Sequence, residues 1–346
     1  MCGITSGLAT VSAKCYAFAR RVWRGQLWRK LAATTRRLGP VPYASVFDTN
    51  TYRSIPALRF AEVSAAESRA ETIPYIDPWV AMELVAHLRD PEERQHRPAR
   101  AAIRRIVEHS KSVRGRTLRS AMLIDSESQV ALHLFGKRLP THDQALAALT
   151  IACEYVASVG MDSPLDEIAP IVDEVAAHVS SVESTYAKRV FDLLIRPVIP
   201  DATAWDAVSR EPSIRNKALA FMRSEEALVA LALSESHRAY DEAGHPRPAS
   251  VLTAVAESVL STFRYAFELQ REVLCGVLGR GWSLERAGRS NWVWDVQIAF
   301  NVGRSVDLLP IRLITDDQQF HDVALRTGYK ALVLKLDDYA KTLLTS

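Results

Sequence analysis

Short apolar runs and helical periods alternate at the two ends of this chain. The run Ala44–Phe47 ends at an acid, Asp48, and its small, β-branched and aromatic residues predict a buried strand. Residues 72–76, 311–314 and 331–336 predict three more strands. Because helical periods separate these strands, they predict a parallel sheet assembled from distant parts of the chain, and therefore an α/β fold.

Helix signals follow the strands at both ends. Asp77 and Pro78 together are typical of a helix start, since Asp caps the first turn and proline fits its first position. The ranges with helical spacing at the two ends are 51–70, 78–88, 98–112, 291–302, the residues around 320–324 and the stretch from 338.

Between about 115 and 285 the pattern changes and is mostly helical, which predicts an all-helical insertion. Residues 120–134 are ambiguous between helix and strand. No fixed repeat period is visible, so the sequence does not support a solenoid. The other helices expected here span 142–159, 164–182, 183–195, 213–221, 225–240 and 250–278.

The composition is ordinary for a soluble globular protein. The chain has 346 residues, of which 48% are apolar and 24% charged. No run approaches the roughly 18 apolar residues that a membrane-spanning helix needs. Four scattered cysteines, without zinc spacing, disfavour a zinc site or a disulfide scaffold. We therefore expect a cytoplasmic protein without a membrane partner.

The net charge of +3 hides two basic regions. Residues 1–43 carry lysines and arginines but no acid, and we interpret them as a basic N-terminal arm; their composition also resembles an organellar transit peptide. A second basic block lies at 94–119. Positive clusters hold the phosphates of nucleic acids, although a solvated helix face is an equal alternative for each. The candidate nucleic-acid-binding residues are Arg100, Arg104, Arg105 and Lys111.

Four acids stand beside strand or helix signals: Asp48, Glu83, Asp295 and Asp317. Asp48 is placed where a strand ends, and the carboxyl ends of parallel strands form the crevice in which ligands bind. Carboxylate oxygens are the ligands that Mg²⁺ and Mn²⁺ prefer. Several acids in one pocket would repel one another without such an ion.

The order of these motifs resembles the PIN-domain nucleases. Asp48-Thr49-Asn50, then Glu83-Leu84 on a helix, then Asp295 before an apolar helix, then Thr-x-Asp-x-x-Phe from Thr315 to Phe320, follow the family order. The resemblance covers only the two ends, about 44–114 and 286–346. It implies a PIN-like three-layer fold with a central parallel sheet, in two parts, interrupted by the large all-helical insertion at 115–285.

The resemblance also implies roles for individual residues. Asp48 would be the central metal ligand, flanked by Glu83 and Asp295, and Asp317 would complete the set directly or through water. Asn50 and Thr315 would orient ligands and water. Asp316 could replace Asp317, but the spacing to Phe320 favours Asp317.

We therefore expect a metal-dependent nuclease, a hydrolase that cleaves phosphodiester bonds with Mg²⁺ or Mn²⁺ and acts on RNA. The alternatives are a PIN-like binding or regulatory module that acts through the helical insertion, and a DNA or structure-selective nuclease. A protein inhibitor could bind the insertion. Asp48-Thr49-Asn50 also resembles haloacid-dehalogenase phosphatases, but those have an aspartate where Asn50 stands. No phosphate-binding glycine motif is present.

Overall fold

A mixed, mostly parallel sheet joins the two ends of the described chain. The computed structural model describes residues 42–345, apart from 140, 248–251 and 285–291. Within those residues, five strands form an open sheet in the order β2-β1-β4-β3, and β5 pairs with β4 off this path. The strands are β1 (Ala44–Phe47), β2 (Ile73–Tyr75), β3 (Ser305–Val306), β4 (Leu309–Ile314) and β5 (Val333–Leu334).

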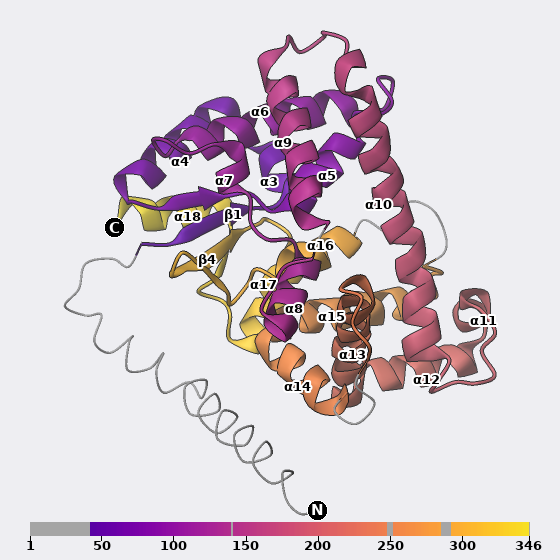
Figure 1. Ribbon diagram of the computed structural model, residues 1–346. Helices are drawn as coiled ribbons and strands as arrows, with labels where there is room; N and C mark the ends of the chain where they lie inside the picture. Colours follow the sequence, from indigo (N-terminus) through magenta and orange to yellow (C-terminus); the bar gives the residue numbers. More distant parts are fainter. Residues whose placement is uncertain (1–41, 140, 248–251, 285–291, 346) are drawn as a thin grey trace, which may run out of the picture. The chain divides into compact units, whose positions relative to one another are not determined.

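The central pairing of the sheet is between β1 and β4. These strands are parallel, with Val46 opposite Leu313 and Phe47 opposite Ile314. Figure 1 shows this contact between the indigo start and the gold end of the described chain. β2 and β5 are also parallel to their neighbours, whereas β3 turns back antiparallel onto β4. The predicted parallel sheet from distant segments is therefore present, with one antiparallel strand that the sequence pattern did not predict.

Helices make up most of the described chain. In the part of the chain that the structure describes, no helix is both long and apolar enough to cross a membrane. The helices near the sheet are α3 (Thr49–Ser54), α4 (Ala57–Arg69), α5 (Pro78–Ala86), α6 (His96–Lys111), α16 (Trp292–Ala299), α17 (Gln318–Thr327) and α18 (Leu336–Leu344). Those in the middle of the chain are α7 (Leu118–Ala121), α8 (Ser126–Phe135), α9 (His142–Ser158), α10 (Ala169–Val190), α11 (Trp205–Arg210), α12 (Pro212–Met222), α13 (Glu225–Glu242), α14 (Leu252–Thr262) and α15 (Arg264–Gly279).

Several helix bounds differ from the predicted ones. The single helix expected at 51–70 is wrong: it is divided into α3 and α4, because Pro56 restricts the residue before it and Ile55 is extended with ψ 125°. The range 250–278 is likewise two helices, α14 and α15, separated at Phe263.

The opposite error occurs at 164–195. The two helices expected there are a single helix, α10, which continues into a π-helical turn at Phe191–Ile195. The sequence has no glycine or proline between residues 171 and 196 that would end the helix near 182. The ambiguous range 120–134 is helical where it is regular: α7 ends at Ala121, and α8 begins at Ser126.

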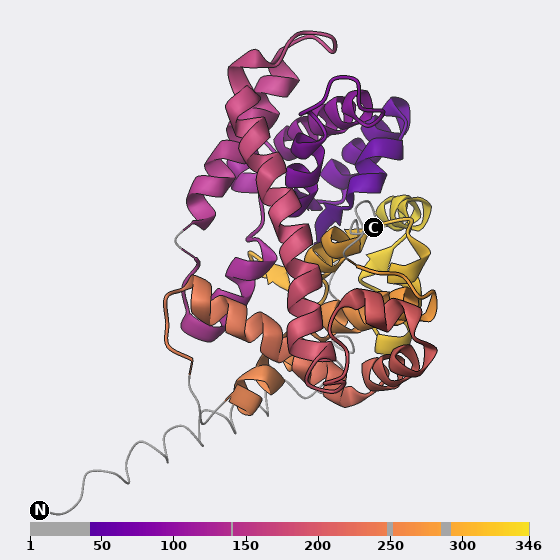
Figure 2. The same cartoon turned by 90° about the vertical axis from the view of Figure 1, so that its right-hand side faces the viewer.

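The helices of the middle region pack directly against those near the sheet. α10 contacts α5, and α9 contacts both α5 and α6. Figures 1 and 2 show α10 as a long helix that runs past the elements beside the sheet. Residues Tyr43–Thr345 form one compact unit. The division at 114/115 and 285/286 stays a prediction, and the basic arm lies outside the described residues apart from its last two positions.

A buried polar network ties β1 to the helices on one face of the sheet. The carboxylate of Glu67, on α4, is fully buried and accepts hydrogen bonds from Ser45 Oγ and Tyr339 Oη, both at 2.6 Å. His109 Nε2, on α6, pairs with its other oxygen, and His109 Nδ1 is 2.8 Å from Tyr52 Oη. One carboxylate thus connects β1, α4, α6 and α18.

Burial alone would raise the pKa of Glu67. The positive charge of His109 and the hydrogen bonds from His109, Ser45 and Tyr339 outweigh burial and lower that pKa below its usual value. The carboxylate is therefore stabilised in its charged form, and the stability it contributes is lost as the pH falls through the lowered pKa.

We predict that Glu67→Ala lowers the free energy of unfolding by about 3 kcal/mol or more, because it leaves a buried histidine and two hydroxyl groups without their acceptor. Urea denaturation followed by circular dichroism measures the change. Glu62→Ala on the same helix is the matched control, because Glu62 is two-thirds exposed and makes only a surface ion pair with Arg59. Equal losses for the two variants would contradict a structural role for the network.

Candidate metal centre

Asp48 lies at the carboxyl end of β1, where the sheet places it beside β4. Its backbone N–H donates to the carbonyl of Ile314 at 3.1 Å, which extends the ladder by one residue. Its side chain caps α3 by accepting from Thr51 N at 2.6 Å, and accepts from Thr315 Oγ1, also at 2.6 Å. Asp48 and Thr315 thus lie side by side at the ends of two parallel strands.

The carboxylate of Asp48 is almost fully buried. Burial raises the pKa of Asp48, while the hydrogen bonds from Thr315 and Thr51 act to lower it, and the nearby charge of Asp316 raises it further. Such a carboxylate is costly to ionise unless more positive charge is supplied.

Glu83 reaches the same region from α5. That helix begins where the sequence predicted, with Asp77 accepting from Trp79 N at 2.7 Å and Pro78 in the first turn. Glu83 Oε2 accepts from Thr49 Oγ1 at 2.6 Å, and Arg53 Nη2 lies 3.4 Å from Glu83 Oε1. Both contacts come from α3, so the helix that Asp48 caps also holds the Glu83 carboxylate.

Asp295 is on α16, and aromatic packing fixes that helix against α5. The ring of Trp294 lies 5.2 Å from that of Trp79, and Asn301 Nδ2 donates to the Asp77 carboxylate. Trp294 Nε1 also donates to Glu183 on α10 at 3.1 Å. The middle of the chain therefore helps to position Asp295.

Asp317 caps α17, accepting from Gln319 N at 2.7 Å, and its own N–H donates to Thr315 Oγ1 at 3.1 Å. Asp316 is exposed, and its Oδ1 accepts from Leu336 N at 3.3 Å at the start of α18. Asn50 is exposed as well. Of the residues expected to orient the acids, Thr315 alone has a hydrogen bond of that kind among those described.

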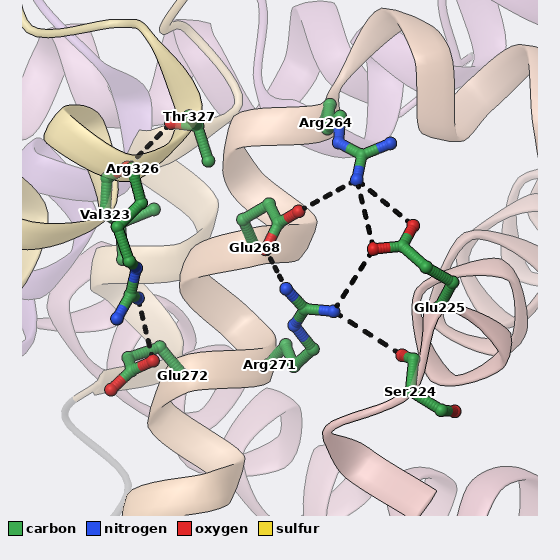
Figure 3. A network of polar contacts seen from close by, with 9 residues as sticks. All are labelled: Ser224, Glu225, Arg264, Glu268, Arg271, Glu272, Val323, Arg326 and Thr327. Atoms are coloured by element: carbon green, nitrogen blue, oxygen red, sulfur yellow. Dashed lines mark hydrogen bonds and ion pairs between the residues drawn. The ribbon is translucent and has the colours of Figure 1, made fainter.

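Helix α15, from the middle of the chain, holds α17 in place. Tyr265 Oη donates to the carbonyl of Phe320 at 2.8 Å in the core. At the surface, Arg326 Nη2 lies 2.8 Å from Glu272 Oε2 (Figure 3). Figure 3 also shows the separate contacts that link α15 to Ser224 and Glu225. The position of Asp317 thus depends on a helix from the middle of the chain.

The charges of the four acids act on one another. Burial raises the pKa of Asp295 well above its usual value, and the charges of Asp317, Glu83 and Asp48 raise it further. This effect requires the side chains to be close, so the fold brings four acids from distant parts of the chain into one region.

The acids are not arranged as a finished ligand set. Among the described residues, no three histidine, cysteine, aspartate or glutamate side chains are placed to hold a metal ion. Both oxygens of Asp48 and both of Glu83 have protein contacts of their own. The all-oxygen donor chemistry suits Mg²⁺ or Mn²⁺, but these side chains would have to turn to share an ion.

The arginines predicted to bind nucleic acid have structural contacts. Arg100 donates to the carbonyls of Ser163 and Gly160, and Arg104 donates to that of Val159. Arg105 donates to the carbonyl of Tyr52 at 2.7 Å at the end of α3. These contacts use donors that a phosphate would need. Lys111 is exposed, and the assignment of all four to nucleic acid stays a prediction.

Two residues at the site were not singled out from the sequence: Thr49 and Arg53. They are four positions apart on α3, and both contact Glu83. Residues with this spacing share a helix face. The signal was present in the sequence, but the predicted helix began at residue 51 and therefore left Thr49 outside it.

Comparisons with known proteins give no further information about this site. No protein-family profile, no curated protein and no solved structure matches the chain.

We predict that Asp295→Asn stabilises the metal-free protein by about 1 kcal/mol or more above neutral pH, because it removes a charge from a crowded, buried position. A raised pKa in the folded state means that wild-type stability is greatest at low pH and falls as the pH rises toward that pKa. This fall should be shallower in Asp295→Asn.

Urea denaturation in EDTA at several pH values tests this. Asp337→Asn serves as the control, because the Asp337 side chain is four-fifths exposed. If the free energy of unfolding depends on pH in the same way in Asp295→Asn and in wild type, the charges of the other acids do not act on Asp295.

Proposed function

We propose that this protein is a metal-dependent nuclease with a PIN-like fold, and that RNA is its substrate. One observation carries the proposal: Thr315 Oγ1 donates to the Asp48 carboxylate at 2.6 Å across the parallel pairing of β1 with β4, which brings the two acidic motifs of the chain together. Burial and the charges of Asp317, Glu83 and Asp48 raise the pKa of Asp295, which supports a shared site near the carboxyl ends of β1 and β4, where open α/β sheets bind ligands. RNA follows from the family resemblance alone.

Asp48, Glu83, Asp295 and Asp317 would hold the ion. When bound, a divalent cation lowers the pKa of a water molecule and neutralises negative charge at phosphorus. Hydrolysis joins the oxygen of water to phosphorus and breaks the bond to the leaving sugar oxygen, which takes a proton. Thr315 and Thr49 keep the carboxylates of Asp48 and Glu83 oriented through their hydroxyl groups.

The rival function is a binding or regulatory module. It is favoured by the lack of a finished ligand set among the described residues and by the contacts that already occupy Asp48 and Glu83. The nuclease proposal differs from it in requiring these side chains to rearrange around an ion. Metal binding and cleavage therefore separate the two functions.

We predict Mn²⁺-dependent cleavage of labelled single-stranded RNA. Asp48→Asn should lower the rate by at least about 100-fold, and Thr315→Val by about 10- to 100-fold, because loss of a group that supports a ligand costs this much and loss of the ligand costs more. Gel analysis of single-stranded RNA, single-stranded DNA and duplex DNA, with and without EDTA, measures both.

Asp337→Asn is the control for these variants. It should cleave RNA at the wild-type rate, because the side chain of Asp337 is exposed on α18. Cleavage of DNA but not of RNA would support the proposed metal centre and overturn the proposed RNA substrate. If pure wild-type protein with Mn²⁺ cuts none of the three substrates, the binding module is favoured.

We also predict that Mn²⁺ or Mg²⁺ raises the melting temperature, because an ion that binds only the folded state stabilises it. At an ion concentration 100 times the Kd, the gain is about 2.7 kcal/mol. Differential scanning calorimetry measures it. The shift should disappear in Asp48→Asn and persist in Asp337→Asn; equal shifts in both would place the ion elsewhere.

A further inference from the structure

Arg53 places a positive charge next to one of the four acids. It lies in the last turn of α3, and its Nη2 is 3.4 Å from Glu83 Oε1. The side chains of Arg53 and Glu83 are only 17% and 15% exposed. Thr49, one turn earlier, donates to the other oxygen of Glu83 at 2.6 Å. One face of α3 therefore holds the Glu83 carboxylate at both oxygens.

The guanidinium of Arg53 is incompletely paired. Its Nε and Nη2 atoms are buried, and neither has a hydrogen-bond partner among the described residues. The contact with Glu83 is an ion pair without hydrogen-bond geometry. Buried polar atoms are nearly always hydrogen-bonded, so two such donors on a single side chain require an explanation.

The backbone of Arg53, by contrast, is held firmly. Arg105 Nη1 donates to the carbonyl of Tyr52 at 2.7 Å and lies 3.4 Å from that of Arg53. Tyr52 in turn is anchored to the buried His109. The end of α3 is thus fixed from α6, while two buried donors of the Arg53 side chain remain unpaired next to Glu83, and the side chain would have to turn to reach a ligand.

We propose that Arg53 binds the non-bridging oxygens of the phosphate that is cleaved. Arginine presents its N–H groups in a planar fork that matches two oxygens of a phosphate. The inference rests on the proposed nuclease function and adds to it the residue that recognises the substrate anion. In the free protein, Glu83 partly neutralises this charge; with an ion and substrate bound, the phosphate takes the unpaired donors.

If Arg53 has this role, replacing it affects Mn²⁺ affinity and RNA cleavage differently. The positive charge of Arg53 next to Glu83 opposes a metal ion at the same carboxylate, so removing it should leave Mn²⁺ binding unchanged or make it tighter. The same change should weaken cleavage, because the phosphate loses its partner. A purely structural arginine would weaken both when it is replaced.

The test compares wild type, Arg53→Gln, Arg53→Lys and the control Arg59→Gln, which removes an arginine from surface ion pairs on α4. Isothermal titration with Mn²⁺ alone gives the metal affinity, and single-turnover cleavage of labelled single-stranded RNA gives kcat/KM. We expect Arg53→Gln to lose at least about 10-fold in kcat/KM, as for one charge-assisted hydrogen bond, without weaker Mn²⁺ binding. Arg53→Lys should retain part of the activity.

The outcomes separate the two proposals. If wild type binds Mn²⁺ and cleaves RNA, and Arg53→Gln is equally active, the proposed role of Arg53 is wrong and the nuclease proposal stands. Parallel losses of Mn²⁺ affinity and cleavage also overturn this role, since they indicate a structural arginine. Absence of Mn²⁺ binding and cleavage in wild type overturns both. If Arg53→Gln does not fold, Arg53→Lys supplies the same comparison.

Discussion

The parallel pairing of β1 with β4 is the contact on which the candidate site depends. It joins strands at opposite ends of the chain and lets Thr315 donate to Asp48 across 267 positions of sequence. Without this ladder, Asp48 and Asp317 would belong to unrelated segments. The cost of closing a long loop grows only slowly with its length, so a large helical region between the two strands is compatible with the pairing. That region is also part of the support: α10 contacts Trp294 beside Asp295, and α15 holds α17.

The site combines burial with negative charge, and three of the four acids have stabilising contacts of their own. Thr51 and Thr315 donate to Asp48, Thr49 and Arg53 contact Glu83, and a helix N-terminus stabilises Asp317. Burial raises the pKa of Asp295, and the charges of Asp317, Glu83 and Asp48 raise it further. A divalent cation would remove the repulsion among these charges, and this is the physical reason for proposing a metal centre here.

Local signals allowed much of the fold to be predicted. The strand before Asp48, the Asp77-Pro78 helix start and the strand before Thr315 all depend on neighbouring residues, and each is present. Helix junctions were harder: no glycine or proline marks the break at Phe263, and the break expected at 182–183 is absent. Contacts between distant residues left almost no trace in the sequence. The carbonyl partners of Arg100, Arg104 and Arg105 come from other elements, so an exposed basic face was a reasonable but incomplete expectation.

The most direct test of the account is the position of a bound ion. Crystals grown with Mn²⁺, measured at a wavelength where manganese scatters anomalously, would locate it. We predict an anomalous peak bounded by carboxylate oxygens of Asp48 and at least two of Glu83, Asp295 and Asp317, with side chains turned from their present partners. Well-ordered carboxylates in their present contacts, with no peak among them, would contradict it.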